Sequence, residues 1–288
     1  MEVSMAFDSD GQLLSLDLLL YLVALSIVMF LSLYIYLSFD ASGSDMIITG
    51  LNDKHMDNLE DALFKTPGMP DNWHLLDDAH VSMVGLCVDN DTYLVSYDKL
   101  LKLRDNPGLI YTVFPSEYRC NVMLEPCDNP TNRINIIRSY SYGGNENVLT
   151  RRIPIIIDYG YNISSFDSDN DNYNCPYNHL NDDGNWRCKS FNISRSSLVA
   201  NRYYILSDNA NVILSNTYGQ NMSLNIKDST DITDKLNMLI TDDEDTIYIH
   251  VRSDNHDSYM VCDKNNRPEH LDSVINPEEY MAIIEIST

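Results

Sequence analysis

The sequence contains one long run without a charged residue. Between Asp17 and Asp40 lie 22 uncharged residues, LLLYLVALSIVMFLSLYIYLSF, the longest such segment of the 288 residues. About 20 apolar residues at 1.5 Å each are enough for a helix to cross the hydrocarbon core of a bilayer. We therefore predict one transmembrane helix near the start of the chain, with all residues after about Asp40 on one side of the membrane.

The charge balance of the chain is strongly acidic. Asp and Glu number 43 against 19 Lys and Arg, which gives a formal net charge of −24. Binding to a nucleic-acid backbone or to anionic lipid requires Lys and Arg, so we expect neither. The carboxylates either form a solvated acidic surface or hold divalent cations.

Cysteines and glycosylation sequons point to an exported head. Six cysteines without a CxxC pair are compatible with up to three disulfides, and pairing by proximity joins Cys120 to Cys127, Cys175 to Cys188 and Cys87 to Cys262. Free buried thiols are the alternative. Sequons occur at Asn90, Asn162, Asn192 and Asn221, all after the apolar run. We therefore predict a single-pass protein of the cell membrane with an extracellular, glycosylated head.

A short segment before the apolar run has the form of a processing signal. It reads Gly11-Gln12-Leu13-Leu14-Ser15-Leu16-Asp17. This segment resembles the class III (prepilin-type) signal of archaeal type IV pilin-like proteins. The resemblance implies that a prepilin peptidase cuts between Gly11 and Gln12, and that other pilin-like subunits are partners. Asp17 then either meets the amino terminus of a neighbouring subunit or complements the dipole of its own helix.

Three further motifs extend the resemblance to about residues 11–103. They are T-P-G-x-P-x-N-W from Thr66 to Trp73, V-G-L from Val84 to Leu86, and S-Y-x-K-L-x-x-L from Ser96 to Leu103. As a set they look like those of a family of archaeal surface proteins that carry the same N-terminal signal. The resemblance implies a pilin-like architecture and no known activity.

The periodicity of the chain predicts an α+β fold. Met46, Ile47, Leu51, Met56, Leu59 and Leu63 recur at near-helical spacing, so an amphipathic half is expected to continue the apolar half of one long N-terminal helix. Pro67 and Gly68 end that helix. The predicted organisation is a leader at 1–11, cleaved or retained, a transmembrane and pilin-like helix at 12–66, and a β-rich globular head at 67–288 with antiparallel sheets and one or two short helices.

Segments rich in Ile, Val, Tyr and Thr predict the strands of the head. They are Val81–Val88, Thr92–Ser96, Leu109–Phe114, Ile134–Tyr142, Val148–Asp158, Tyr203–Leu206, Val212–Leu214, Ser223–Ile226, Thr246–Val251, Tyr259–Cys262 and Tyr280–Ile286. Short helices are predicted at Tyr97–Leu103 and within Asp231–Ile240. The stretch from Ser164 to Ser190 is predicted to be a long surface loop.

That loop contains the one candidate metal site. Asp167, Asp169 and Asp171 alternate as in the first half of a calcium-binding EF-hand loop, but Asn172 and Asn178 occupy the positions of the required Gly and Glu. A solvated acidic loop is the favoured interpretation, and a noncanonical calcium site is the alternative. No cofactor other than calcium is suggested.

No catalytic motif appears in the chain, so we predict that it is not an enzyme. A cluster of tyrosines suggests stacking on surface glycans, although half-buried strand positions also favour tyrosine; they are Tyr140, Tyr142, Tyr159, Tyr161, Tyr173 and Tyr177. The favoured function is a membrane-tethered, pilin-like structural or adhesion protein. The alternatives are a monomeric ectodomain that binds carbohydrate or a divalent cation, and a surface hydrolase.

Overall fold

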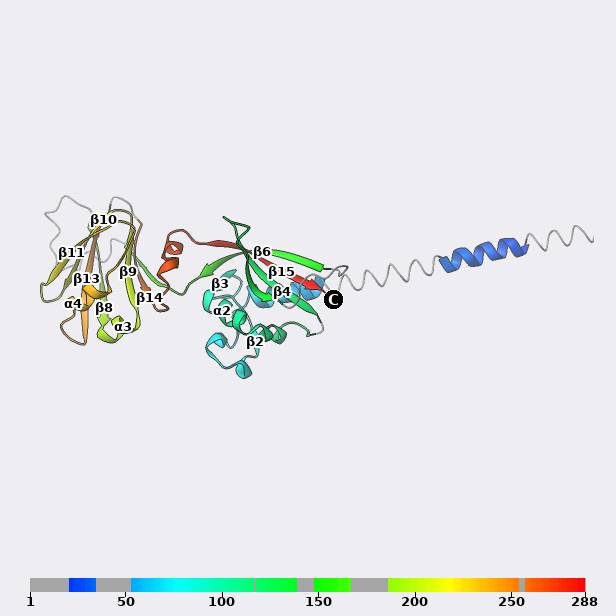
Figure 1. Ribbon diagram of the computed structural model, residues 1–288, viewed down its shortest axis with the longest axis horizontal. Helices are drawn as coiled ribbons and strands as arrows, with labels where there is room; N and C mark the ends of the chain where they lie inside the picture. The colour runs from blue at the N-terminus through cyan, green and yellow to red at the C-terminus, as the bar shows by residue number, and fades with distance from the viewer. Residues whose placement is uncertain are drawn as a thin grey trace, which may run out of the picture. The chain divides into compact units, whose positions relative to one another are not determined.

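The computed structural model describes residues 21–34, 53–116, 118–138, 148–166, 186–253 and 257–287. The chain divides into two compact units, Met1–Asp57 and Asn58–Thr288 (Figure 1). Each is considered by itself below.

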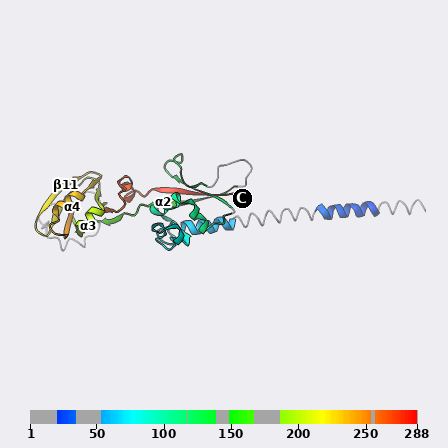
Figure 2. The same ribbon diagram turned by 60° about the horizontal axis from the view of Figure 1, so that its bottom comes forward.

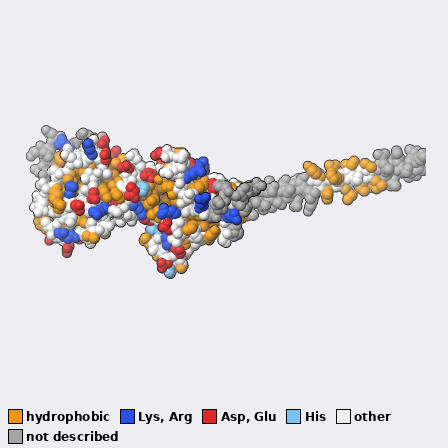
Figure 3. Space-filling view, in the orientation of Figure 1, with side chains coloured by type: hydrophobic (Ala, Val, Ile, Leu, Met, Phe, Trp, Pro, Cys, Tyr) orange, Lys and Arg blue, Asp and Glu red, His pale blue; other side chains and the backbone are white. Residues whose placement is uncertain are grey.

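The prediction of one long N-terminal helix is wrong. The described residues contain a helix at 21–34 and another at 53–64. The first has apolar side chains exposed along its length, such as Phe30 at 72 %, and Figure 3 shows them on the face in view. Among the described residues, no helix is both long and apolar enough to cross a membrane, which overturns the predicted transmembrane helix and single-pass membrane localisation.

The unit Asn58–Thr288 is β-rich, as predicted, and a five-stranded sheet forms its first part. In spatial order the strands are β3 (Leu94–Ser96), β6 (Val148–Asp158), β15 (Glu279–Ser287), β4 (Arg119–Pro126) and β5 (Ile134–Arg138). All pairs are antiparallel except β3 with β6. β6 and β15 pair over nine residues, from Glu279 opposite Ile156 to Ser287 opposite Val148.

Alternation along these strands produces one buried face. In β6 the side chains of Ile153, Ile155 and Ile157 are buried while those between them are largely exposed. Leu59 and Leu63 of helix 53–64 are fully buried. The remaining elements of this part are β1 (Gly68–Met69), η1 (Trp73–Leu75), η2 (Asp78–His80), β2 (Met83–Val84), α2 (Tyr97–Asp105) and η3 (Pro107–Thr112).

Two four-stranded sheets form the second part. One has the order β12-β9-β14-β7 and the other β11-β10-β13-β8, with all neighbours antiparallel. The strands are β7 (Asn162–Ser165), β8 (Trp186–Ser194), β9 (Arg202–Ser207), β10 (Ala210–Asn216), β11 (Asn221–Ile226), β12 (Ser229–Asp231), β13 (Glu244–Arg252) and β14 (Ser258–Asp263). Taken in chain order, the strands switch from one sheet to the other at every connection except that between β10 and β11, which are neighbours in one sheet. This is the order of a jelly roll, the double-sheet form of two Greek keys.

The two sheets share one apolar core. It contains Val212 and Leu214 of β10 and Ile247 of β13 from one sheet, with Ile205 of β9 and Met260 of β14 from the other. The helices α3 (Arg195–Ala200) and α4 (Thr233–Leu239) contribute to the same core (Figure 2). Because β9 and β14 are buried on both faces, a second cluster forms on their other side with η6 (Pro268–Val274), through Leu206, Val261 and Leu271.

The jelly roll is inserted between the paired strands β6 and β15. The chain enters it after Tyr159, and side-chain contacts link α2 to the segment through which the chain leaves it. The Arg267 guanidinium forms an ion pair with Asp98 of α2 and lies 4.7 Å from the ring centre of Tyr97. His270 stacks on Tyr159, with ring centres 4.0 Å apart and planes at 12°.

Candidate functional site

The three sequence motifs meet in one place, where Gly68 lies against Gly85. Gly68 has a φ of +86°, in the left-handed region that favours glycine. A Cβ on Gly85 would lie 2.3 Å from the Gly68 amide nitrogen and 2.4 Å from the Thr66 carbonyl oxygen. Only hydrogen fits between the two segments, so glycine is required at both positions.

Hydrogen bonds tie these segments to the end of helix 53–64. The Trp73 Nε1–H donates to the Gly85 carbonyl at 2.8 Å, and Trp73 is fully buried. The Cys87 amide donates to the Thr66 carbonyl at 3.1 Å, and its thiol donates to the Phe64 carbonyl at 2.7 Å. With Lys99, these residues make up what we call the 66–99 node.

Lys99 on α2 links the node to the five-stranded part. Its side chain is 4 % exposed, and Nζ donates to the Pro67 carbonyl at 2.8 Å and to the Cys87 carbonyl at 2.7 Å. An ammonium has three N–H groups, so one remains beyond these two bonds. Burial lowers the pKa of Lys99, and the negative charge of Asp71 opposes that shift.

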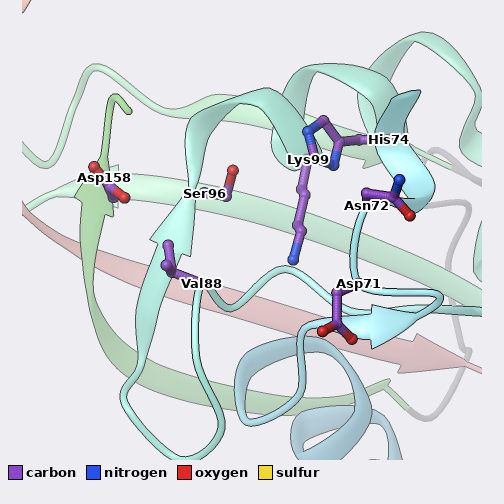
Figure 4. Close-up of a pocket in the computed structure, with 7 residues that line it drawn as sticks. All are labelled: Asp71, Asn72, His74, Val88, Ser96, Lys99 and Asp158. Carbon is purple, nitrogen blue, oxygen red and sulfur yellow. The ribbon is translucent and has the colours of Figure 1, made fainter. Parts of the chain in front are cut away.

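A cavity of about 270 Å³ opens beside the Lys99 side chain (Figure 4). We call it the Lys99 pocket. Residues from five parts of the chain line it: the turn after β1, η1, the segment after β2, the β3–α2 junction and the end of β6. The lining residues are Asp71, Asn72, His74, Val88, Ser96, Lys99 and Asp158.

The pocket presents both hydrogen-bond donors and acceptors. Ser96 is the N-cap residue of α2, yet its side chain makes no capping hydrogen bond. One oxygen of Asp158 accepts from the Gly160 amide at 2.9 Å, which leaves the other for a further donor. His74 has a lowered pKa, first because of its burial and then because of the nearby Lys99, so its imidazole is neutral.

The described lining residues of the pocket contain no pair of groups arranged for nucleophilic catalysis. No described nucleophile in the pocket has a hydrogen-bonded base, which activation of a hydroxyl or thiol requires. Among the residues that the structure describes, no group of three or more His, Cys, Asp or Glu side chains is placed to hold a metal ion. Lys99 donates to main-chain oxygens and so holds the protein's own segments together.

The predicted disulfides are wrong. Among the described cysteines none forms a disulfide; they are Cys87, Cys120, Cys127, Cys188 and Cys262. Cys120 lies near the start of β4 and Cys127 follows its end. Seven residues of strand separate their Cα atoms by about 23 Å, whereas a disulfide requires about 4.4–6.8 Å. The predicted pairing of Cys175 with Cys188 involves a residue outside the described ranges. Of the third predicted pair, Cys87 lies in the node and Cys262 lies on β14 of the jelly roll.

Many other predicted site residues fall outside the described ranges. These are Gly11, Gln12 and Asp17 of the signal, Asp167, Asp169 and Asp171 of the calcium candidate, Cys175, and the tyrosines Tyr140, Tyr142, Tyr173 and Tyr177. Tyr159 and Tyr161 are described, and their rings lie 6.3 Å apart beside His270 and Arg267. Tyr159 is buried and Tyr161 is half-buried, so the ring of Tyr159 has no open face for a sugar.

The four sequon asparagines are exposed, three of them on strands. Asn162 lies on β7, Asn192 on β8 and Asn221 on β11, and Asn90 lies in a turn. Glycosylation at these positions stays a prediction.

Sequence reasoning did not identify Lys99 as a site residue. The available signal was its position within the predicted helix Tyr97–Leu103, next to Leu100 and four residues before Leu103. A lysine on the apolar face of a short helix must find acceptors inside the protein.

Comparisons with known proteins give no identity for the chain. No family model, no curated protein and no solved structure matches it. The resemblance to archaeal type IV pilin-like proteins therefore stays a prediction.

Proposed function

We propose that this chain is a non-catalytic structural or adhesion protein, in which the 66–99 node and the five-stranded sheet carry the jelly roll as a binding module. The observation that carries this proposal is the use of Lys99, Trp73 and Cys87. Each directs its polar hydrogens to main-chain carbonyl groups of a neighbouring segment. The amine, indole and thiol groups of this region therefore stabilise the fold by binding main-chain oxygens.

The connection of the jelly roll supports the same proposal. Both of its ends join strands that pair with each other, β6 and β15. A force applied to the jelly roll therefore acts on both of these strands. The Arg267–Asp98 ion pair and the stack of His270 on Tyr159 add contacts across this connection. Double-sheet jelly rolls occur in lectin and capsid domains, which is an analogy of fold and says nothing of a particular ligand.

The test is a paired measurement of retention and turnover. The full chain is passed over immobilised cellulose, chitin and mannan, with the heat-unfolded chain as control, and is incubated with chromogenic glycoside, ester and peptide substrates. We expect saturable retention on at least one polysaccharide and no turnover. Turnover that Lys99→Met abolishes while the fold is retained would refute the proposal, as would a chain that is retained on no surface and stays monomeric at every concentration.

A further inference from the structure

We propose that the Lys99 pocket binds a neutral sugar unit. The inference rests on the proposed adhesion function and adds a second ligand site, which lies outside the jelly roll, in the part of the fold that holds the five-stranded sheet. The argument combines the size of the cavity, the charges of its lining and the hydrogen-bonding groups that the protein leaves unused.

The size of the cavity fits a single small ring. Pockets for drug-sized ligands measure about 300–1,000 Å³, and the Lys99 pocket, at about 270 Å³, lies just below that range. One monosaccharide unit is therefore accommodated better than an extended peptide or a nucleotide. Val88 supplies an apolar wall for the C–H face of such a ring.

The charges of the lining exclude strongly charged ligands. An anion attracted by the Lys99 ammonium would also meet the carboxylates of Asp71 and Asp158, and a cation attracted by the carboxylates would meet Lys99. Like charges placed close together disfavour binding in either case. A neutral ligand that carries both donors and acceptors avoids both conflicts.

The unused polar groups match hydroxyl groups. A hydroxyl donates one hydrogen bond and accepts two. Acceptors are the Asp71 carboxylate and the second oxygen of Asp158. Donors are the third N–H of Lys99 and the amide of Asn72, and the Ser96 hydroxyl serves as either because it makes no capping bond. Figure 4 shows these groups around one opening. Adjacent hydroxyl groups of a pyranose ring offer both donors and acceptors, so they can form hydrogen bonds with the acceptors and donors of this lining.

The experiment is a titration of the full chain, followed by isothermal calorimetry and by saturation-transfer NMR. The neutral probes are the methyl glycosides of glucose, galactose and mannose, and N-acetylglucosamine. Glucuronate and glucosamine serve as the anionic and cationic comparisons. We expect at least one neutral probe to bind with a Kd on the order of 1 mM, and both charged probes to bind more weakly.

Variants locate the binding. Asp71→Asn, Asp158→Asn and Ser96→Ala remove unused groups and spare the Lys99 contacts that hold the node. Each is expected to weaken binding by about tenfold with an unchanged melting temperature. Asp128→Asn, an exposed carboxylate after β4 that does not line the pocket, is the matched control and should change nothing.

Each outcome is decisive. Saturable binding of a neutral probe that the three variants weaken and the control does not supports the inference. Failure of every neutral probe to saturate in the millimolar range overturns it, as does binding that the variants leave intact. If the chain is still retained on polysaccharide in either case, binding by the jelly roll stands and only the site in the Lys99 pocket is wrong.

Discussion

Replacement of Gly85 by alanine tests whether the 66–99 node holds the first part of the fold together. The new Cβ would lie 2.3 Å from the Gly68 nitrogen and 2.6 Å from Thr66 Oγ1, whereas ordinary contact begins at 3.4 Å. The two segments must therefore separate by about 1 Å. That movement lengthens the Cys87 amide to Thr66 carbonyl bond, now 3.1 Å, beyond hydrogen-bonding distance.

The expected loss of stability follows from these contacts. Overpacking costs about 1–3 kcal/mol, and loss of the bonds from Cys87 to Thr66 and from Trp73 to Gly85 costs about 1 kcal/mol each. The sum, about 3–5 kcal/mol, is a large fraction of the roughly 5–15 kcal/mol that stabilises a typical protein. With about 2–4 °C of melting temperature per kcal/mol for a domain of this size, we expect a decrease of about 10 °C.

The assay is thermal unfolding followed by circular dichroism and by the fluorescence of buried Trp73. Gly108→Ala is the matched control because a Cβ there has no atom within 4 Å and the residue has no positive φ. This control should melt at the wild-type temperature or slightly above it. If Gly85→Ala melts within about 2 °C of Gly108→Ala, the close contact does not hold the node and the reasoning is refuted.

Two further predictions use the buried cation and the free thiols. Lys99→Met should lower the free energy of unfolding by about 2–4 kcal/mol, because two buried carbonyls lose a charged donor. Lys102→Met, which removes an ion pair at the surface, should lower it by less than about 1 kcal/mol. Equal effects of the two variants in chemical denaturation would contradict this prediction. Without reductant, exposed Cys127 should be alkylated in the folded protein and buried Cys120 only after unfolding. Burial raises the pKa of Cys120 to about 12, so stability should fall above pH 9, where the unfolded thiol ionises first, and Cys120→Ala should reduce that slope.

Strands with an uninterrupted pattern could be predicted from the sequence. Val148–Asp158 has the same bounds in the prediction and in β6, because buried isoleucines alternate with exposed residues along it. The helix predicted within Asp231–Ile240 is α4. A short apolar run is ambiguous, and the predicted strand Leu109–Phe114 is instead mostly η3, where Pro107 in the first turn favours a helical start.

Strand β8 shows why part of the jelly roll escaped prediction. Its residues Arg187 and Lys189 pair with Val251 and Ile249, so two cations occupy positions on the face that holds the core. The Lys189 ammonium crosses to the Ser165 carbonyl of the other sheet at 3.2 Å. Charged residues at inward positions hide the alternation of apolar and polar residues that identifies a strand. The sequence therefore predicts a loop where β8 begins.

The candidate site was visible in the sequence only as separate motifs. Gly68, Gly85 and Lys99 are spaced too far apart for any local rule to bring them together. Their roles depend on a close approach of main chains and on carbonyl groups of other segments, which are properties of tertiary structure. The apolar run gives the opposite case, because its length is a local signal that predicts one continuous helix across a membrane, and this prediction is wrong.

The insertion of the jelly roll has a consequence for synthesis of the chain. β6 leaves the ribosome before the jelly roll, and its partner β15 leaves after it. At about 5–20 residues per second, β15 follows β14 by about 1–3 seconds, so the inserted module can begin to close around its own core while the middle strand of the five-stranded sheet is still missing. Until β15 is synthesised, the five-stranded sheet lacks its middle strand and β6 lacks the partner that it pairs with in the folded protein.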